Sequence, residues 1–421
     1  MPGTDTPVVR QTEIYLDGVA GRKPRIPVDP WALEERARRK LSREAYAYVA
    51  GGAGGESTMR ANREAFERRH IVPRVLRDVS TRDMAITLFG RTIPAPLLLA
   101  PIGVLELAHP EADLAVARAA AAAGLPFIFS NQASIPMEEC AREMGAAPRW
   151  FQLYWSKNDA LVESLVERAE ACGCEAIVVT LDTKLLGWRI RDLDLAYLPF
   201  LRGKGIAQYV SDPVFMAGLG ATGPAPARRV NLHSLRVFAE LTRAHPGGFW
   251  TNVRSKAPLA AVQHFIATYS RQSLEWSDLA FLRDRTKLPI LLKGILHPDD
   301  AVRALDHGID GLIVSNHGGR QVDGAIAALD ALPGVVEAVG GRVPVLMDGG
   351  IRVGADVLKA IALGAHAVCV GRPYVYALAL AGSAGVLELL RHLAADFELA
   401  MALSGYRSVS EIGSDALAPT V

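Results

Sequence analysis

The chain has 421 residues, of which 50% are hydrophobic and 22% are charged, and its 46 Lys and Arg residues nearly balance 45 Asp and Glu residues, leaving a net charge of +1. This is the composition of a globular protein with a large core, and the lack of a basic surplus argues against a nucleic-acid partner. Four cysteines in a chain of this length do not form a disulfide framework, so we expect a reducing, cytoplasmic setting. We expect no signal peptide, because the N-terminus lacks a basic stretch followed by an apolar run, and no membrane span, because the apolar stretch 374–387 is interrupted at Gly382 and Ser383.

The first predicted element is a helix over residues 30–50, which a glycine-rich loop follows at 51–55. Because this loop follows a helix and not a strand, we do not expect a dinucleotide-binding fingerprint there. The alternation of strands and helices that follows begins only near residue 97. Residues 1–96 are therefore predicted to form an N-terminal helical extension.

Eight short apolar runs then recur along the chain and predict strands. They lack the alternation of a half-exposed strand and so indicate a parallel sheet that is covered on both faces. Helical patterns lie between several of them, at 111–123, 158–172, 298–307 and 354–363. Eight alternations of strand and helix predict an α/β fold, the (β/α)8 or TIM barrel. The predicted strands are 97–100, 126–130, 150–154, 176–181, 289–293, 311–315, 343–348 and 367–371.

A long insertion follows the fourth predicted strand and occupies residues 195–275 of a barrel that spans 97–400, with 401–421 as a C-terminal tail. The insertion holds nine Lys and Arg residues and three Asp and Glu residues, or +6, which leaves −5 for the rest of the chain. It is either a solvated surface excursion or a cationic lid that attracts an anionic substrate.

Polar residues cluster where the predicted strands end, which is the edge at which barrel enzymes place their reactive groups. Glycine-rich turns follow the last two strands, and each turn carries an arginine, Arg352 and Arg372. Backbone N–H groups, a helix N-terminus and a guanidinium converging on one point predict a phosphate site.

His317 lies between a serine and two glycines, and alone it would more often be structural than catalytic. Asp182 could orient its imidazole so that it acts as a base, and Arg320 and Arg189 could clamp a carboxylate. Together they indicate an enzyme acting on a small hydroxy or keto acid. Lys293 at the same edge could form a Schiff base or serve as a fixed cation beside an electron-accepting cofactor.

Three motifs carry a resemblance to the FMN-dependent 2-hydroxy-acid oxidase and dehydrogenase family, over roughly residues 30–415. They are SNHGGRQ at 315–321, LMDGGIR at 346–352 and VGRP at 370–373. Within the family, the chain most resembles the lactate 2-monooxygenase branch, through segments that include 198–203 and 209–215 inside the insertion. The resemblance implies FMN as cofactor, no metal, and a homo-oligomer, a tetramer or an octamer.

The resemblance also implies residue roles. His317 would be the base, with Asp182 behind it, and Tyr154 would hydrogen-bond the reacting oxygen. Arg320, Arg189 and Tyr48 would bind the substrate carboxylate. Lys293 would lie against the N1 and O2 edge of the flavin, where its charge favours the anionic reduced ring. The other flavin-binding residues would be Pro101, Ile102, Gly103, Ser130, Gln152, Thr180 and Ser315 for the ring, and Asp348, Gly350, Arg352, Gly371 and Arg372 for the ribityl chain and phosphate.

Two residues depart from the family pattern: Gln132 replaces an aromatic residue of glycolate oxidases, and Gly103 replaces an alanine of many oxidases. We expect an FMN enzyme that oxidises a small L-2-hydroxy acid, lactate above all, with oxygen to give acetate, carbon dioxide and water. The alternatives are an oxidase that releases keto acid and hydrogen peroxide, and a dehydrogenase that passes electrons to a quinone or a protein. Two further alternatives are a barrel enzyme that acts on a phosphorylated metabolite and a flavin-binding module without catalytic activity.

Overall fold

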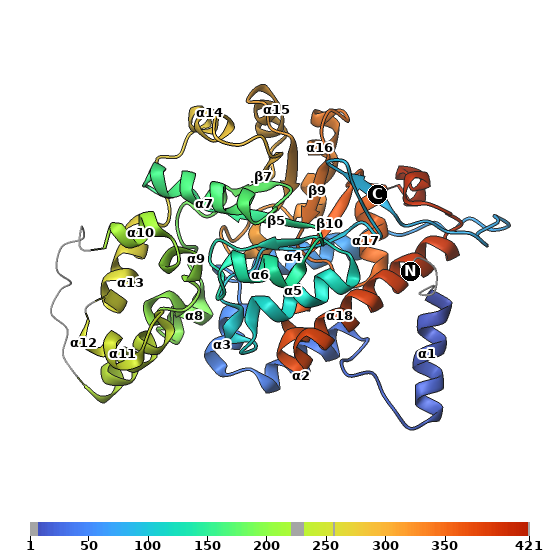
Figure 1. Cartoon of the computed structure of the whole chain (residues 1–421). Coiled ribbons are helices and arrows are strands. Elements are labelled where there is room, and N and C mark those ends of the chain that lie inside the picture. The colour runs from blue at the N-terminus through green and yellow to red at the C-terminus, as the bar shows by residue number, and fades with distance from the viewer. Residues whose placement is uncertain (1–6, 220–230, 256, 420–421) are drawn as a thin grey trace.

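The computed structural model of the protein describes residues 7–219, 231–255 and 257–419, and its centre is a closed barrel of eight parallel strands (Figure 1). The strands follow one another around the barrel in chain order, and the last pairs with the first. The predicted (β/α)8 fold and all eight predicted strands are confirmed. The strands are β3 (Leu97–Leu99), β4 (Phe127–Phe129), β5 (Arg149–Leu153), β6 (Ile177–Thr180), β7 (Ile290–Ile295), β8 (Gly311–Val314), β9 (Val345–Asp348) and β10 (Ala367–Val370).

Two apolar cores account for the continuous apolar runs of the strands. One lies between the barrel and its helices, and the smaller one fills the barrel with residues such as Leu98, Ile128 and Leu346. The hairpin of β1 (Ile86–Leu88) and β2 (Arg91–Ile93) packs its apolar residues into this smaller core. One end of the barrel is thereby closed, and the functional groups are left to the end at which the strands terminate.

Eight helices surround the barrel in the described residues. They are α5 (Ala112–Ala123), α6 (Met137–Met144), α7 (Asp159–Ala171), α14 (Leu279–Arg283), α15 (Pro298–Asp306), α16 (Ala328–Val339), α17 (Gly354–Ala362) and α18 (Arg372–Leu403). Four of them, α5, α7, α15 and α17, confirm the four predicted helical patterns.

The last helix, α18, is long and apolar enough to cross a membrane, but 67% of its apolar window is buried inside the protein. It packs against α5 and α17, and its helical conformation is interrupted at Ala381 and Gly382, as the sequence suggested. These contacts are those of a core helix. Because α18 continues to Leu403, the predicted start of the C-terminal tail at residue 401 falls inside it.

The N-terminal extension contains four helices: α1 (Pro7–Val19), α2 (Pro30–Lys40), α3 (Arg43–Ala50) and α4 (Ser57–Glu67). The prediction of one helix over 30–50 was wrong, because the chain turns extended at Leu41 and Ser42. The Ser42 side chain accepts a hydrogen bond from the Ala45 N–H and caps a new helix. The glycine-rich loop then links α3 to α4 beside the barrel mouth.

The insertion forms a helical group of its own, on the left in Figure 1. Its aromatic core includes Tyr209, Phe215 and Phe265. Several of its basic residues are paired, for example Arg202 with Glu240 and Lys204 with Glu106; Arg228, Arg229 and Lys256 lie outside the described residues. Its described helices are α9 (Ala207–Val210), α10 (Pro213–Ala217), α11 (Leu232–Ala244), α12 (Phe249–Arg254) and α13 (Ala257–Thr268), with a 3-10 helix at Pro199–Arg202; α8 (Ile190–Asp194) directly precedes the insertion.

Candidate active site

A cavity of about 360 Å³ lies where the barrel strands end, between them and the insertion. Most of the predicted site residues line it, although they come from segments that are far apart in the sequence. The lining members are Tyr48, Pro101, Ile102, Gly103, Tyr154, Arg189, Lys293, His317, Arg320, Asp348, Gly350, Arg352, Gly371 and Arg372.

The other predicted residues are buried next to this lining and support it. Ser315 accepts a hydrogen bond from Lys293, and Asp182 accepts one from His317. Gln152 accepts hydrogen bonds from Ser130 and the Asn131 N–H, and Thr180 lies in register with Lys293 on the neighbouring strand.

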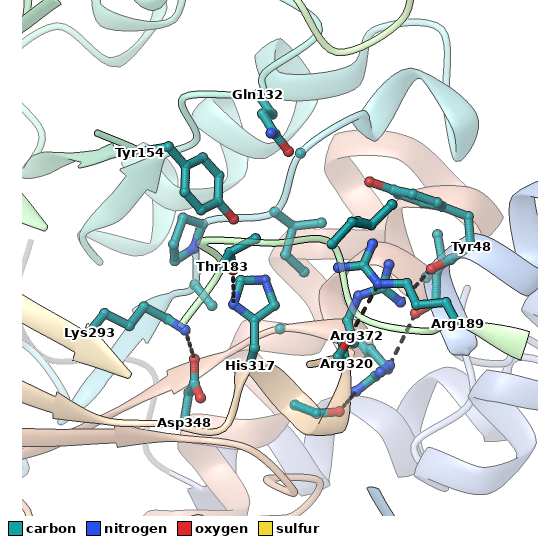
Figure 2. Close-up of a pocket in the computed structure, with 18 of the residues that line it drawn as sticks. Tyr48, Gln132, Tyr154, Thr183, Arg189, Lys293, His317, Arg320, Asp348 and Arg372 are labelled. Carbon is teal, nitrogen blue, oxygen red and sulfur yellow. Dashed lines mark hydrogen bonds and ion pairs between the residues drawn. The ribbon is translucent and has the colours of Figure 1, made fainter. Parts of the chain in front are cut away.

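His317 lines the cavity, with Thr183 next to it (Figure 2), and forms a close pair with Asp182 behind the lining. Their Nδ1 and Oδ1 atoms are 2.7 Å apart, and the Thr183 hydroxyl donates to the same carboxylate oxygen over 2.9 Å. Because Nδ1–H points at the carboxylate, Nε2 keeps its lone pair for a proton. Burial lowers the pKa of His317 below 6.5, against the opposing charge of Asp182. The ring is therefore neutral at pH 7 and able to act as a base.

Lys293 reaches the cavity from β7 as a buried cation. Its Nζ lies 2.9 Å from Asp348 Oδ2 and donates to Ser315 Oγ over 2.8 Å. Burial alone would lower the pKa of Lys293, but Asp348 and Asp182 outweigh it and raise the pKa. A Schiff base requires a neutral amine, so the geometry favours the fixed cation of the two possibilities.

Arg320 and Arg189 are cations that line the cavity, and the charges of both act on the nearby Asp192 carboxylate. Arg320 donates to the carbonyl oxygens of Tyr48 and Gly51, at 2.6 and 2.8 Å, and Arg189 donates to Gln321 and the Arg320 carbonyl. Among the described residues, neither forms an ion pair with a carboxylate. Burial beside Arg189 lowers the pKa of Arg320 to about 9. An anionic ligand would stabilise both guanidinium groups by accepting their hydrogen bonds and balancing their charge.

The part of the cavity lined by the turns after β9 and β10 has the features of a phosphate site. Gly349 and Gly350 adopt positive φ values of 98° and 85°, and a Cβ at Gly350 would lie 2.5 Å from the Asn62 carbonyl oxygen. The buried Nε of Arg352 has no partner. Arg372 donates to three carbonyl oxygens of the surrounding loops, so it also holds the walls of the site.

Unpaired polar atoms test whether a flavin mononucleotide suits this cavity. Gln152 Nε2, Thr180 Oγ1 and Arg352 Nε are buried without a hydrogen-bond partner, which is costly unless a ligand supplies one. The first two lie at the ends of β5 and β6, and the third follows β9. A ligand that has a ring with polar edges and a phosphate would supply hydrogen-bond partners for these atoms, so the residues present fit FMN.

The sequence reasoning missed the roof of the cavity. It is made by apolar and aromatic side chains, most of them from the insertion, and none of the insertion's described basic residues lines it, so the described part of the insertion does not form a cationic lid over the cavity. Only the length of the insertion signalled a cover; nothing in the sequence identified the side chains. The roof residues are Leu186, Leu198, Phe200, Leu201, Phe265, Ile266 and Tyr269.

The two departures from the family pattern prove to be neighbours. A Cβ at Gly103 would lie 2.8 Å from the Gln132 carbonyl oxygen and 2.9 Å from its Cβ, closer than real Cβ contacts allow. Gln132 also lines the cavity. The backbone of Gln132 therefore occupies the space that the missing methyl group of Gly103 leaves.

A barrel whose open end joins a base, a buried lysine and two arginines without a close carboxylate ion pair in the described residues is the arrangement of an oxidoreductase that binds an organic anion beside a phosphate-bearing cofactor. The sequence model of the FMN-dependent dehydrogenases matches residues 37–419, and the chain belongs to this family, which depends on FMN. It is accordingly an FMN-dependent 2-hydroxy-acid oxidoreductase.

Relatives and a solved structure agree with this assignment. The chain is 41% identical over 397 residues to an L-lactate oxidase of Lysinibacillus sphaericus, covering 94% of each chain. It is 40% identical over 387 residues to glycolate oxidase of Spinacia oleracea, covering 91% of this chain and 94% of the other. A crystal structure of mandelate oxidase with (S)-4-hydroxymandelic acid matches with a TM-score of 0.77 and 39% identity, over 93% of this chain and 98% of the other.

Proposed function

We propose that the protein oxidises L-lactate with molecular oxygen and decarboxylates the product, as a lactate 2-monooxygenase does. The observation that carries the proposal is the apolar roof that the insertion places over the base and the arginines. Each lactate anion and each oxygen molecule consumed would give one acetate anion, one carbon dioxide and one water, which balances atoms and charge. A covered site favours this outcome because the keto acid must stay beside the peroxide that oxidises it.

The residues of the cavity divide the work between binding and proton transfer. Arg320 and Arg189 would hold the substrate carboxylate, with Tyr48 beside them, and place the 2-hydroxyl group near His317. His317 Nε2 would accept the hydroxyl proton, while Asp182 stabilises the imidazolium that forms. Tyr154 would hydrogen-bond the reacting oxygen; burial raises its pKa to about 12, so it remains a donor.

FMN, when bound, supplies the two-electron acceptor for this oxidation. Lys293 would hold the ring at its polar edge, where a fixed positive charge stabilises negative charge. The backbone of residues 101–103 would face the ring. The remaining ligands would be Ser130, Gln152, Thr180 and Ser315 for the ring, and Asp348, Gly350, Arg352, Gly371 and Arg372 for the ribityl phosphate.

The second candidate function is that of an oxidase, which releases pyruvate and hydrogen peroxide. The similarity to an L-lactate oxidase favours it. Product analysis under air separates the two: we expect one acetate for each oxygen molecule consumed. Equal amounts of pyruvate and peroxide would instead show an oxidase, and turnover with negligible oxygen uptake would show a dehydrogenase with a quinone or protein acceptor.

The roof itself can be tested through Leu201, which lines the cavity and is 40% exposed. We expect Leu201→Ala to open the rim and to raise the share of pyruvate and peroxide among the products at least about twofold, with little change in the rate of flavin reduction. Leu235→Ala is the matched control, because Leu235 lies on α11 of the same insertion, 53% exposed, and does not line the cavity. An unchanged product ratio in Leu201→Ala would contradict retention by the roof.

We also propose that the protein is a cytoplasmic homo-oligomer. Its four cysteines are all free, and three of them are buried, which suits a reducing compartment. Light scattering on the purified FMN-bound protein would measure the number of subunits.

A further inference from the structure

The turn that carries His317 has a strained backbone. His317, Gly318 and Gly319 have consecutive positive φ values of 57°, 61° and 75°. Glycine adopts this conformation freely, but a residue with a side chain does not, and it stays there only when the surrounding structure holds it. Since the imidazole direction follows from this backbone, whatever holds the turn also aims the ring.

Two buried amides close this turn from the N-terminal extension. Asn62 of α4 donates to Asn316 Oδ1 over 2.9 Å, and Asn316 donates back to Asn62 Oδ1 over 2.8 Å. The same Asn316 Oδ1 accepts from the Gly319 N–H at 3.1 Å. Both asparagines are at most 5% exposed.

The pair has no unused polar atom. Asn316 Nδ2 also donates to the Ile326 carbonyl over 3.1 Å, and Asn62 Oδ1 also accepts from the Ala328 N–H over 3.1 Å. A buried network in which each side-chain nitrogen and oxygen has a partner favours one geometry, whereas removing one member leaves buried groups unpaired. The turn therefore depends on a residue from α4, far earlier in the chain.

Other contacts hold the backbone on either side of this pair. Arg372 binds the Gly318 carbonyl and the Ala53 N–H binds the Gly319 carbonyl. Thr58, one turn earlier on α4, donates to the Val322 carbonyl and accepts from the Ala325 N–H. These Thr58 bonds dock the helix on the loop beyond the turn and do not reach Asn316.

We propose that Asn62 is a positioning residue for the reaction, which acts through Asn316 to aim the imidazole of His317. The inference rests on the proposed role of His317 as the base. It concerns the rate of proton abstraction, because Asn62 touches neither the carboxylate clamp nor the roof. Misplacing a reacting group by about 1 Å costs up to about 10²-fold in rate.

The test is anaerobic flavin reduction by L-lactate in the FMN-bound enzyme, followed by loss of the oxidised flavin absorbance. For Asn62→Ala we expect the limiting rate to fall at least about 10-fold, with half-saturating lactate within about twofold of the wild type. Asn62→Asp keeps the Oδ1 acceptor for Asn316 and Ala328 but turns a carboxylate oxygen toward the acceptor Asn316 Oδ1, so its loss should be at least as large. Thr58→Val is the matched control: it removes the hydrogen bonds of the Thr58 hydroxyl between α4 and the loop and should reduce flavin at close to the wild-type rate.

The outcomes distinguish the role of His317 as the base from the positioning role of Asn62. If His317→Ala reduces flavin normally, the role of the base is wrong, and the positioning role falls with it. If His317→Ala is inactive but Asn62→Ala is within twofold of the wild type, only the positioning role is overturned. An equal loss in Thr58→Val would also overturn it, because the effect would then be general docking of α4. If Asn62→Ala does not retain FMN, Asn62→Asp carries the same test.

Discussion

His317→Ala is expected to keep its bound FMN and its fold but to lose flavin reduction by about 10²–10⁴-fold, the usual worth of a general base. The His317 side chain lines the cavity. Its ring contacts the Asp182 carboxylate and the Thr183 hydroxyl. The measurement is the limiting rate of anaerobic bleaching by L-lactate. A variant that bleaches within about tenfold of the wild-type rate would exclude His317 as the base.

The pH dependence of the same rate gives an independent check. The base must be neutral, so reduction needs a pH above the pKa of His317. Burial lowers that pKa below 6.5, so we expect the rate to be constant through neutral pH and to fall only below pH 6.5. An acid limb well above 6.5 would contradict a buried, neutral imidazole.

A remote histidine supplies the control for the substitution. His297 precedes α15, with its side chain 66% exposed, and is not among the cavity residues. Its ring accepts a hydrogen bond from the Asp299 N–H, so His297→Ala should cost about 1 kcal/mol of helix capping at most. Its flavin reduction should be unchanged, which separates loss of a base from loss of a histidine.

The barrel could be predicted from the sequence because parallel strands that are buried on both faces are continuous apolar runs. Their polar ends lie at one edge, so Lys293, His317 and Asp348 could be placed together from the sequence alone. The prediction used only the order of residues along the chain and the rule that all strands of this barrel end at the same face. Nothing comparable exists for contacts between distant segments.

The parts that could not be predicted depend on such contacts. The Asn62–Asn316 pair joins two unremarkable amides across most of the chain, and the roof side chains Leu198 and Ile266 resemble any other apolar residues. The break between α2 and α3 was missed because both sides of Ser42 have helical composition, and the capping hydrogen bond decides the outcome. In each case the signal is a partner in space and not a pattern along the chain.

Arg320→Lys is expected to raise the half-saturating lactate concentration about 10–100-fold, since a charge-assisted hydrogen bond is worth about 1.5–3 kcal/mol. One nitrogen of Arg320, Nη1, already donates to the Tyr48 and Gly51 carbonyls, and its other N–H groups remain for a substrate carboxylate. A lysine ammonium is a single point of charge and cannot satisfy both.

Arg60→Lys is the matched control for that substitution, because Arg60 is an exposed arginine that donates to the Gly55 carbonyl of the neighbouring loop over 2.8 Å. Its kinetics should match the wild type. In Arg320→Lys the rate at saturating lactate should fall less than the apparent affinity, because His317 keeps its contact with Asp182. If affinity is unchanged while the saturating rate collapses, Arg320 does not bind the carboxylate, and its two bonds to the N-terminal segment would be its main contribution.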